Sequence, residues 1–162
     1  MSSALKNLSD FSTANLPDVS QKRFAIIVSE WNTEVTGALY TGAFDTLLKH
    51  GVQENHIVSA QVPGSFELSL GAQKFAQRED IDAVICLGCV IQGETRHFDF
   101  ICQAVANGIT EVGIKTLIPT IFGVLTTETL EQASERAGGK HGNKGEEAAI
   151  TAIKMAALAS NF

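Results

Sequence analysis

The stretch RFAIIVSEWNTEVTGALYTGAFDTLLKHG, residues 23–51, indicates how this chain is built. Its first seven residues form a nearly unbroken apolar run, which is typical of a strand that is covered on both faces. Over residues 33–50 the apolar side chains fall at helical spacing, and Gly51 stands where a helix C-cap is expected. The stretch therefore predicts a buried strand followed directly by a helix, which is how a βαβ unit begins.

The same alternation of strand and helix continues along the chain. Apolar runs predict three more strands, at residues 57–62, 83–90 and 119–125. Helical spacing predicts helices from the turn PGSFE (63–67) to about Ala76, over 98–115, from a cap at Thr126 or Thr127 through Arg136, and over 146–159. Residues 138–145, GGKHGNKG, are too rich in glycine to predict regular structure. We expect an α/β fold, a three-layer α/β/α sandwich around a flavodoxin-like, doubly wound, four-stranded parallel sheet.

Length and composition indicate a single folded domain. The chain has 162 residues, of which 44% are hydrophobic and 19% are charged, and this balance is that of a globular protein. We assign residues 23–162 to the domain and residues 1–22 to a polar N-terminal extension. A net charge of −6 argues against a nucleic-acid partner, which would need clustered basic residues.

The chain also lacks the marks of membrane insertion or export. No apolar run approaches the roughly 20 residues that span a bilayer, so no membrane partner is expected. The N-terminus MSSALKNLSDFSTANLPDVSQ has no basic region followed by an apolar core. Cys86, Cys89 and Cys102 lie in apolar stretches, as cysteines do in a reducing compartment. We therefore expect a cytoplasmic protein.

The segments that follow the four predicted strands hold the residues that a core does not explain. These segments are WN at Trp31, PGSFE at Pro63, GETRH at Gly93 and TT at Thr126. Because parallel strands end at a common edge, where ligands bind in such sheets, we expect the four segments to form one site. A ligand there would meet an aromatic ring, backbone amides, hydroxyls, a carboxylate and an imidazole.

The first two segments each have an ordinary interpretation beside a functional one. Trp31 is suited to stacking on a planar heterocycle, or it is a rim aromatic that covers the first helix. Asn32 is equally well explained as a helix N-cap. Glu67 is favoured in a first helical turn by the helix dipole, whereas with Phe66 it could hold a polyol chain through hydrogen bonds to hydroxyls.

The third segment has the features of an anion site beside a proton-transfer group. Gly93, Glu94 and Thr95 would present backbone N–H groups at a helix N-terminus, although a lone glycine loop is weak support and no Walker motif is present. His97 could exchange protons near neutral pH, or it could be a surface histidine without a role. Arg136 or Lys144 could complete a phosphate grip, and their separation along the chain suggests that they come from a neighbouring subunit.

Metal and disulfide chemistry have little support in the sequence. Cys86 and Cys89 form a CxxC within a predicted strand, where residues three apart face opposite sides of the sheet. Neither a shared zinc ion nor a disulfide fits that geometry. The four histidines, at positions 50, 56, 97 and 141, show no metal-binding spacing. We expect no metal and no cofactor.

Six motifs in order give the chain a resemblance to the lumazine synthase family, from about Arg23 to the end. They are WN, VPGSFE, LGCVIQGETRHFD, FGVLTTE, EQASERAGGKHGNKG and EAAITAIKMA. The resemblance implies a transferase of riboflavin biosynthesis. In this family 5-amino-6-(ribitylamino)pyrimidinedione condenses with 3,4-dihydroxy-2-butanone 4-phosphate to give 6,7-dimethyl-8-ribityllumazine, phosphate and water.

The resemblance also implies a role for each candidate site residue. The pyrimidine and its ribityl chain would be held by Trp31, Asn32, Ser65, Phe66, Glu67, Val90, Ile91, Phe122 and Lys144. The phosphate would be bound by Gly93, Glu94, Thr95 and Arg136. His97 would be the catalytic residue and would move protons. Phe122, Arg136 and Lys144 would come from the adjacent subunit.

Assembly follows from the same resemblance, which implies rings of five subunits. The segment RAGGKHGNKG lacks extra residues that we associate with relatives that stop at pentamers, so we expect an icosahedral shell. The N-terminal extension would add a strand to a neighbour's sheet, and riboflavin synthase is a possible partner. Trp31 stands where many relatives have Phe, and Gln92 where many have a basic residue. The rival hypotheses are a flavin-binding module without turnover and a purely structural shell protein.

Overall fold

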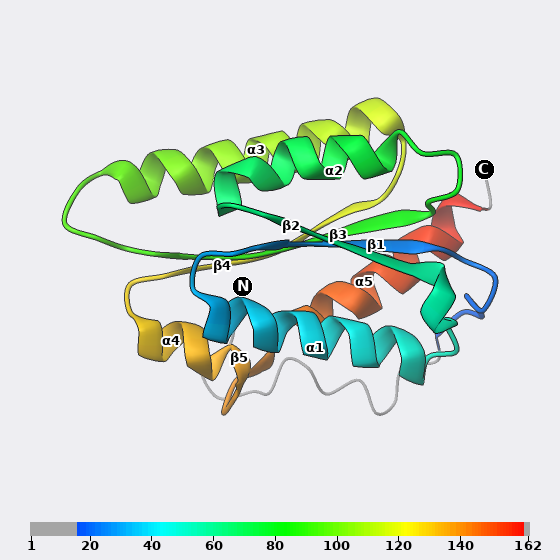
Figure 1. The fold of residues 1–162 in the computed structure, drawn as a ribbon, viewed down its shortest axis with the longest axis horizontal. Helices are drawn as coiled ribbons and strands as arrows, with labels where there is room; N and C mark the ends of the chain where they lie inside the picture. The colour runs from blue at the N-terminus through cyan, green and yellow to red at the C-terminus, as the bar shows by residue number, and fades with distance from the viewer. Residues whose placement is uncertain (1–15, 161–162) are drawn as a thin grey trace.

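The computed structural model describes residues 16–160, and its centre is a four-stranded parallel sheet (Figure 1). The strands are β1 (Phe24–Ser29), β2 (Ile57–Val62), β3 (Ala83–Ile91) and β4 (Thr120–Thr127). Their order across the sheet is β2-β1-β3-β4. After β1 the chain turns to one side to form β2, then returns to the other side for β3. The reversal falls at β1 and β3, where ligands bind in folds of this kind.

Helices cover both faces of this sheet (Figure 1). One face carries α2 (Leu68–Ala76) and α3 (His97–Thr116). The other carries α1 (Thr33–Lys49), α4 (Leu130–Glu135) and α5 (Lys144–Ala159). Short 3₁₀ turns, η1 (Glu54–His56) and η2 (Ser65–Glu67), stand before and after β2. This arrangement confirms the expected three-layer, flavodoxin-like α/β fold.

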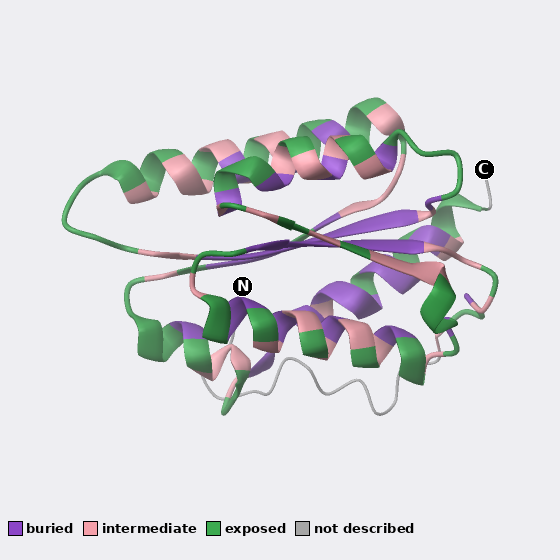
Figure 2. Cartoon of the chain, in the orientation of Figure 1, coloured by how far each residue is buried: buried purple, intermediate pink, exposed green. Residues whose placement is uncertain are grey.

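The core consists of two apolar layers, one on each side of the sheet. Because side chains alternate along a strand, Phe24 and Ile26 of β1 pack towards α1 and α5, whereas Ile27 packs towards α2 and α3. The sheet is buried at its centre and the outer faces of the helices are exposed (Figure 2). Cys86 and Cys89 lie in opposite layers, which confirms the prediction that they cannot act together. Each large side chain that is fully buried stabilises the fold by roughly 1.5–3 kcal/mol.

Close packing of α1 against the start of α5 depends on glycine. A Cβ atom at Gly145 would overlap the carbonyl oxygen of Leu39 in α1. The neighbouring Asn143 ties the two helices together, because its Nδ2 donates to the Ala38 carbonyl at 3.0 Å and its Oδ1 accepts from the Gly145 amide at 2.8 Å. The glycine-rich segment therefore has a packing role in this fold.

The prediction of irregular structure over residues 138–145 is wrong. The segment forms an antiparallel hairpin of β5 (Ala137–Gly139) and β6 (Gly142–Asn143), and α5 already begins at Lys144. Gly138 and Gly142 have φ angles of 113° and 82°, in the region that favours glycine. Strands of two or three residues are too short to show a periodic pattern, so the sequence could not predict them.

The cap predicted for α4, the short helix after β4, is also wrong. Thr126 and Thr127 belong to β4, where they pair with Val90 and Ile91 of β3. The cap of α4 is instead Thr129, whose side chain accepts a hydrogen bond from the Gln132 amide at 3.2 Å. Strand pairing thus continues two residues beyond the predicted end of the strand.

The pairing predicted for the N-terminal extension concerns residues that lie mostly outside the described part of the chain. Its last residues pack on their own domain, with Val19 buried in the core. Lys22 forms an ion pair with Asp82, with the Nζ and Oδ1 atoms 2.8 Å apart. Within residues 16–160, none of the helices combines the length and the apolar character that crossing a bilayer requires.

Candidate active site

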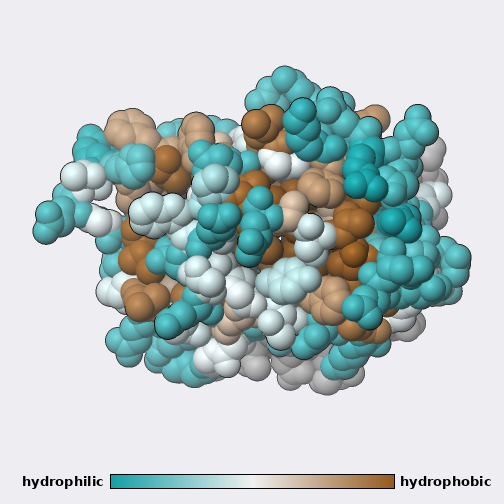
Figure 3. All heavy atoms as spheres, in the orientation of Figure 1, coloured by the Kyte–Doolittle hydropathy of each residue, from teal (hydrophilic) through white to brown (hydrophobic). Residues whose placement is uncertain are grey.

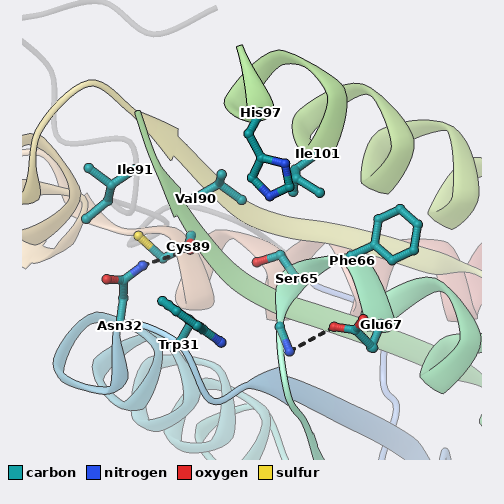
Figure 4. Close-up of a pocket in the computed structure, with 11 residues that line it drawn as sticks. Trp31, Asn32, Ser65, Phe66, Glu67, Cys89, Val90, Ile91, His97 and Ile101 are labelled. Atoms are coloured by element: carbon teal, nitrogen blue, oxygen red, sulfur yellow. Dashed lines mark hydrogen bonds between the residues drawn. The ribbon is translucent and has the colours of Figure 1, made fainter. Parts of the chain in front are cut away.

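A pocket of about 680 Å³ opens at the carboxyl ends of β1, β2 and β3, on the face covered by α2 and α3 (Figure 4). It is lined by Trp31, Asn32, Gly64, Ser65, Phe66, Glu67, Cys89, Val90, Ile91, His97 and Ile101. Three of the four predicted segments therefore contribute to one site. The fourth, at Thr126, contributes no lining residue, although its threonines pair with Val90 and Ile91 of β3, which do line the pocket.

Trp31 and Asn32 follow β1 and have distinct local roles. The Trp31 side chain is 73% exposed at the rim, so a face of the indole is open to a ligand. Asn32 has a φ of 59°, a left-handed conformation that Asn adopts more readily than most residues. Its Nδ2 donates to the Cys89 carbonyl at 3.0 Å and makes no capping bond to α1. Asn32 thus occupies the predicted N-cap position of α1, but its side chain does not cap the helix and instead joins the β1–α1 turn to β3.

The PGSFE segment forms η2 and directs its side chains to different places. One carboxylate oxygen of Glu67 accepts a hydrogen bond from the Gly64 amide at 3.0 Å, as drawn in Figure 4. Glu67 therefore stabilises the turn as well as lining the pocket. Phe66 is 56% exposed and adds apolar surface at the rim. Ser65 is almost fully buried and points into the pocket.

Two buried hydroxyls lie in the floor beneath this pocket. Neither Ser29 Oγ nor Ser65 Oγ has a hydrogen-bond partner among the described residues. Both approach Gly88 of β3, where a Cβ atom would be 2.7 Å from Ser65 Oγ and 3.3 Å from Ser29 Oγ. Buried hydroxyls are nearly always hydrogen-bonded in proteins. Gly88 therefore leaves room for two hydroxyls that lie buried beneath the pocket.

His97 is the first residue of α3 and faces the pocket from the side opposite Trp31 (Figure 4). Its backbone amide donates to Thr95 Oγ1 at 3.4 Å. The imidazole is exposed, so it can exchange protons with water or with a bound molecule. The structure thus brings His97 beside Thr95 and into the same pocket as the indole, as the sequence predicts.

Gly93, Glu94 and Thr95 lie next to this pocket but are not among its lining residues. They belong to the loop between β3 and α3, which extends beyond the body of the domain (Figure 1). All three are exposed. The N-cap position of α3 is Arg96, so the loop precedes the helix instead of forming its first turn.

Phe122, Arg136 and Lys144 are the site residues that this chain does not bring to the pocket. Phe122 lies midway along β4, in register with Cys86. Arg136 follows α4 and Lys144 begins α5, in the helical layer on the other face of the sheet (Figure 1). A site that combines these three residues with the pocket of Trp31 and His97 requires two copies of the chain.

Two lining residues, Cys89 and Ile101, were not predicted from the sequence, and neither were Ser29 and Gly88 in the floor beneath them. Ser29 carries a usable signal, because it is a polar residue that ends an otherwise apolar run. Burial raises the pKa of the Cys89 thiol to about 11, so this thiol is a poor nucleophile. Among residues 16–160 there is no cluster of three or more His, Cys, Asp or Glu residues that could hold a metal ion.

The fold and the pocket define a class of protein: a doubly wound, flavodoxin-like α/β protein with a pocket at its topological switch point. Residues 21–160 match the family model described as 6,7-dimethyl-8-ribityllumazine synthase, and the chain belongs to this family.

Three relatives are similar to this chain over nearly their whole length. The chain is 64% identical to the 6,7-dimethyl-8-ribityllumazine synthase of Cytophaga hutchinsonii, over 97% of this chain and 98% of that protein. It is 52% identical to the enzyme of the same name from Porphyromonas gingivalis, over 98% of each chain. It is also 52% identical to that of Parabacteroides distasonis, over 96% of this chain and 97% of the relative.

Proposed function

We propose that this protein is a 6,7-dimethyl-8-ribityllumazine synthase, a transferase of riboflavin biosynthesis. It joins 5-amino-6-(ribitylamino)pyrimidinedione to 3,4-dihydroxy-2-butanone 4-phosphate and releases phosphate and water. The observation that carries the proposal is that Trp31, Glu67 and His97 line one pocket in a chain of this family. These residues supply a stacking surface, an acceptor for hydroxyls and a proton-transfer group.

The pyrimidine substrate occupies the part of the pocket between Trp31 and η2. Its ring stacks on the open face of the indole, where a planar heterocycle gains contact area at little entropic cost. Backbone groups of Val90 and Ile91 hold the ring edge, while Asn32 keeps the loop under the indole in place. Ser65, Phe66 and Glu67 hold the ribityl chain, because a carboxylate accepts hydrogen bonds from hydroxyls.

The phosphoketone lies on the other side of the pocket, towards the β3–α3 loop. Amides of Gly93, Glu94 and Thr95 donate to its phosphate, and Arg136 of an adjacent copy adds a charged fork. Phe122 and Lys144 of that copy contact the pyrimidine. This division explains why three of the site residues are remote from the pocket within one chain.

His97 transfers protons as the substrate amine attacks the ketone and as phosphate departs. Acid–base assistance of this kind contributes about 10² to 10⁴-fold. Holding two substrates in register contributes more, up to roughly 7–11 kcal/mol when the orientation is good. No bound metal or cofactor is needed for a condensation whose substrates carry both the amine and the leaving group.

A shared site requires assembly, and the surface of the chain suits it. Large apolar side chains are exposed on and beside the helices, including Leu70, Phe100, Ile114 and Leu117. On the face shown in Figure 3, hydrophobic residues reach the surface between hydrophilic ones. We assign these surfaces to contacts within a ring of five and between rings in an icosahedral shell, with riboflavin synthase as a possible further partner. Sedimentation velocity distinguishes shells from free pentamers.

Two further assignments rest on the sequence. Residues 1–22 are the extension that would pair with a neighbour, and residues 23–162 are the catalytic domain. The three free cysteines of the chain favour a cytoplasmic location.

The test of the proposed function is to mix the purified protein with both substrates. The lumazine product, followed by its absorbance, and orthophosphate should appear in equal amounts. Neither should appear when one substrate is left out. A flavin-binding module would bind riboflavin through Trp31 without turnover, and a structural shell protein would assemble without doing either. Absence of product with a correctly assembled protein would refute the proposed lumazine synthase activity.

A further inference from the structure

Glu147 in the first turn of α5 forms a bridge between two basic side chains. Its Oε1 is 2.7 Å from Nη2 of Arg136, and its Oε2 is 3.2 Å from Nζ of Lys144. The Glu147 side chain is only 14% exposed. A single, partly exposed carboxylate thus holds both cations, which are the two basic residues that the proposed function assigns to the substrates.

Arg136 is fixed from a second direction as well. Its Nη1 donates to the carbonyl oxygen of His141 at 2.6 Å, and the Lys144 amide donates to the Arg136 carbonyl at 2.8 Å. A guanidinium group has five N–H donors, and these contacts with Glu147 and His141 use two of them. The remaining donors keep a fixed direction, because both terminal nitrogens are anchored.

The charges explain why an acidic residue is needed between these cations. Two positive groups that reach the same carboxylate would repel each other if that carboxylate were neutral. Arginine binds phosphate through the geometry of its planar fork, so a guanidinium that can turn away loses affinity even if its charge is kept. Glu147 reduces the net charge of the three groups from +2 to +1, and in exchange it holds the fork in one orientation.

A nearby acidic residue provides a comparison within the same hairpin. Glu135 lies within ion-pair distance of Lys140 and His141, with Glu135 Oε2 3.6 Å from His141 Nε2. It therefore ties the hairpin tip to α4, and neither Arg136 nor Lys144 is among its ion-pair partners. The two glutamates have similar chemistry, and they differ in whether they hold the cations of the site.

We propose that Glu147 is a positioning residue for the phosphate-bearing substrate. By fixing Arg136 and Lys144 together, it sets the donors that one copy of the chain presents to the pocket of the next. This inference rests on the proposed function, since it concerns how that site recognises the phosphoketone.

The test compares Glu147→Gln with Glu135→Gln in the assembled protein, with each substrate varied in turn. Glu147→Gln should raise the KM for the phosphoketone about tenfold, equivalent to one weakened charge-assisted hydrogen bond. kcat should stay within about twofold, because the pocket of Trp31 and His97 is unchanged. The KM for the pyrimidine should rise by a smaller factor than that for the phosphoketone, because Glu147 also holds Lys144. Product inhibition by orthophosphate should weaken in parallel. Glu135→Gln should leave all four quantities near their wild-type values.

Glu147→Asp provides a rescue that a purely structural role would not show. It keeps the charge with a shorter side chain, so the KM for the phosphoketone should fall between those of the wild type and Glu147→Gln. If Glu147→Gln does not assemble, Glu147→Asp decides alone, and an unchanged KM for the phosphoketone overturns the inference. An equal effect of Glu135→Gln overturns it as well. Failure of the wild type to form lumazine would instead refute the proposed function.

Discussion

At the scale of single residues, His97 and Arg136 have separate tasks under the proposed function. His97→Ala should lower kcat by at most about 10⁴-fold without abolishing turnover, because proton transfer is a smaller contribution than substrate alignment. Arg136→Ala should mainly raise the KM for the phosphoketone, because a charged fork to its phosphate is lost. Steady-state kinetics on both variants measures this ranking. Complete inactivity of His97→Ala, or an unchanged KM for Arg136→Ala, would contradict it.

Ser29 provides a residue-scale prediction about stability. Its buried hydroxyl has no partner among the described residues, so Ser29→Ala should leave the free energy of unfolding unchanged or raise it by about 1 kcal/mol. Thr116→Val is the matched control, because the Thr116 hydroxyl donates to the Val112 carbonyl at 2.7 Å. The control should lose about 1 kcal/mol. Denaturant unfolding measures both variants, and a clear loss for Ser29→Ala would mean that its hydroxyl is satisfied within the fold.

Single residues also mark what the sequence could and could not predict about the site. Trp31, Glu67 and His97 follow predicted strands, so the rule for parallel sheets was sufficient to bring them together. The hydrogen bond from Asn32 to the Cys89 carbonyl could not be predicted from the sequence, because it depends on a left-handed backbone conformation that several residues allow. The floor formed by Gly88 depends on contacts between three segments, which no local pattern reports.

At the scale of helices and strands, the contact between α1 and α5 should tolerate no side chain at Gly145. Gly145→Ala should destabilise the protein by more than about 2 kcal/mol although alanine favours helices, because the added methyl group meets the Leu39 carbonyl. Gly37→Ala in α1 is the control, since open space surrounds that position. It should stabilise the protein by roughly 0.5–1 kcal/mol. Thermal unfolding distinguishes the two, and similar effects of both substitutions would contradict the packing argument.

The buried strand β3 leads to a prediction about pH. Burial raises the pKa of Cys86 to about 12 and that of Cys89 to about 11, from an ordinary value of 9.0. The folded protein keeps these protons while the unfolded chain loses them, so stability should fall as the pH rises above 9.0. The slope is at most about 1.4 kcal/mol per thiol and pH unit. Cys86→Ala should reduce the slope of the unfolding free energy against pH, measured by denaturant unfolding above pH 9.0. An equal slope in that variant would refute the contribution of the buried Cys86 thiol.

Elements differ in how well the sequence predicted them. Apolar runs predicted β1 and β3 most directly, because strands covered on both faces need apolar residues throughout. The strand β2 is only partly buried, and its place in the alternation of strands and helices supported its prediction. The hairpin of β5 and β6 was missed, since glycine conformations and contacts with α1 determine it. Register and the end of β4 at Thr127 depend on pairing with β3, which is a property of the folded sheet.

At the scale of the whole molecule, the proposed function divides the site into two parts that cannot meet within one chain. The pocket with Trp31 and His97 lies on the face covered by α2 and α3, whereas Arg136 and Lys144 lie in the opposite helical layer. In the proposed ring, each copy would give Arg136 and Lys144 to one neighbour and receive the same pair from the other. The assembly is therefore part of the catalytic unit in this account.

The most direct measurement mixes His97→Ala and Arg136→Ala chains, refolded together in equal amounts. In random rings, about a quarter of the sites would combine an intact His97 from one copy with an intact Arg136 from its neighbour. Lumazine formation under limiting phosphoketone should therefore rise to about a quarter of the wild-type rate, well above the mean of the two separate variants. A mixture that only matches that mean would contradict a site shared between copies.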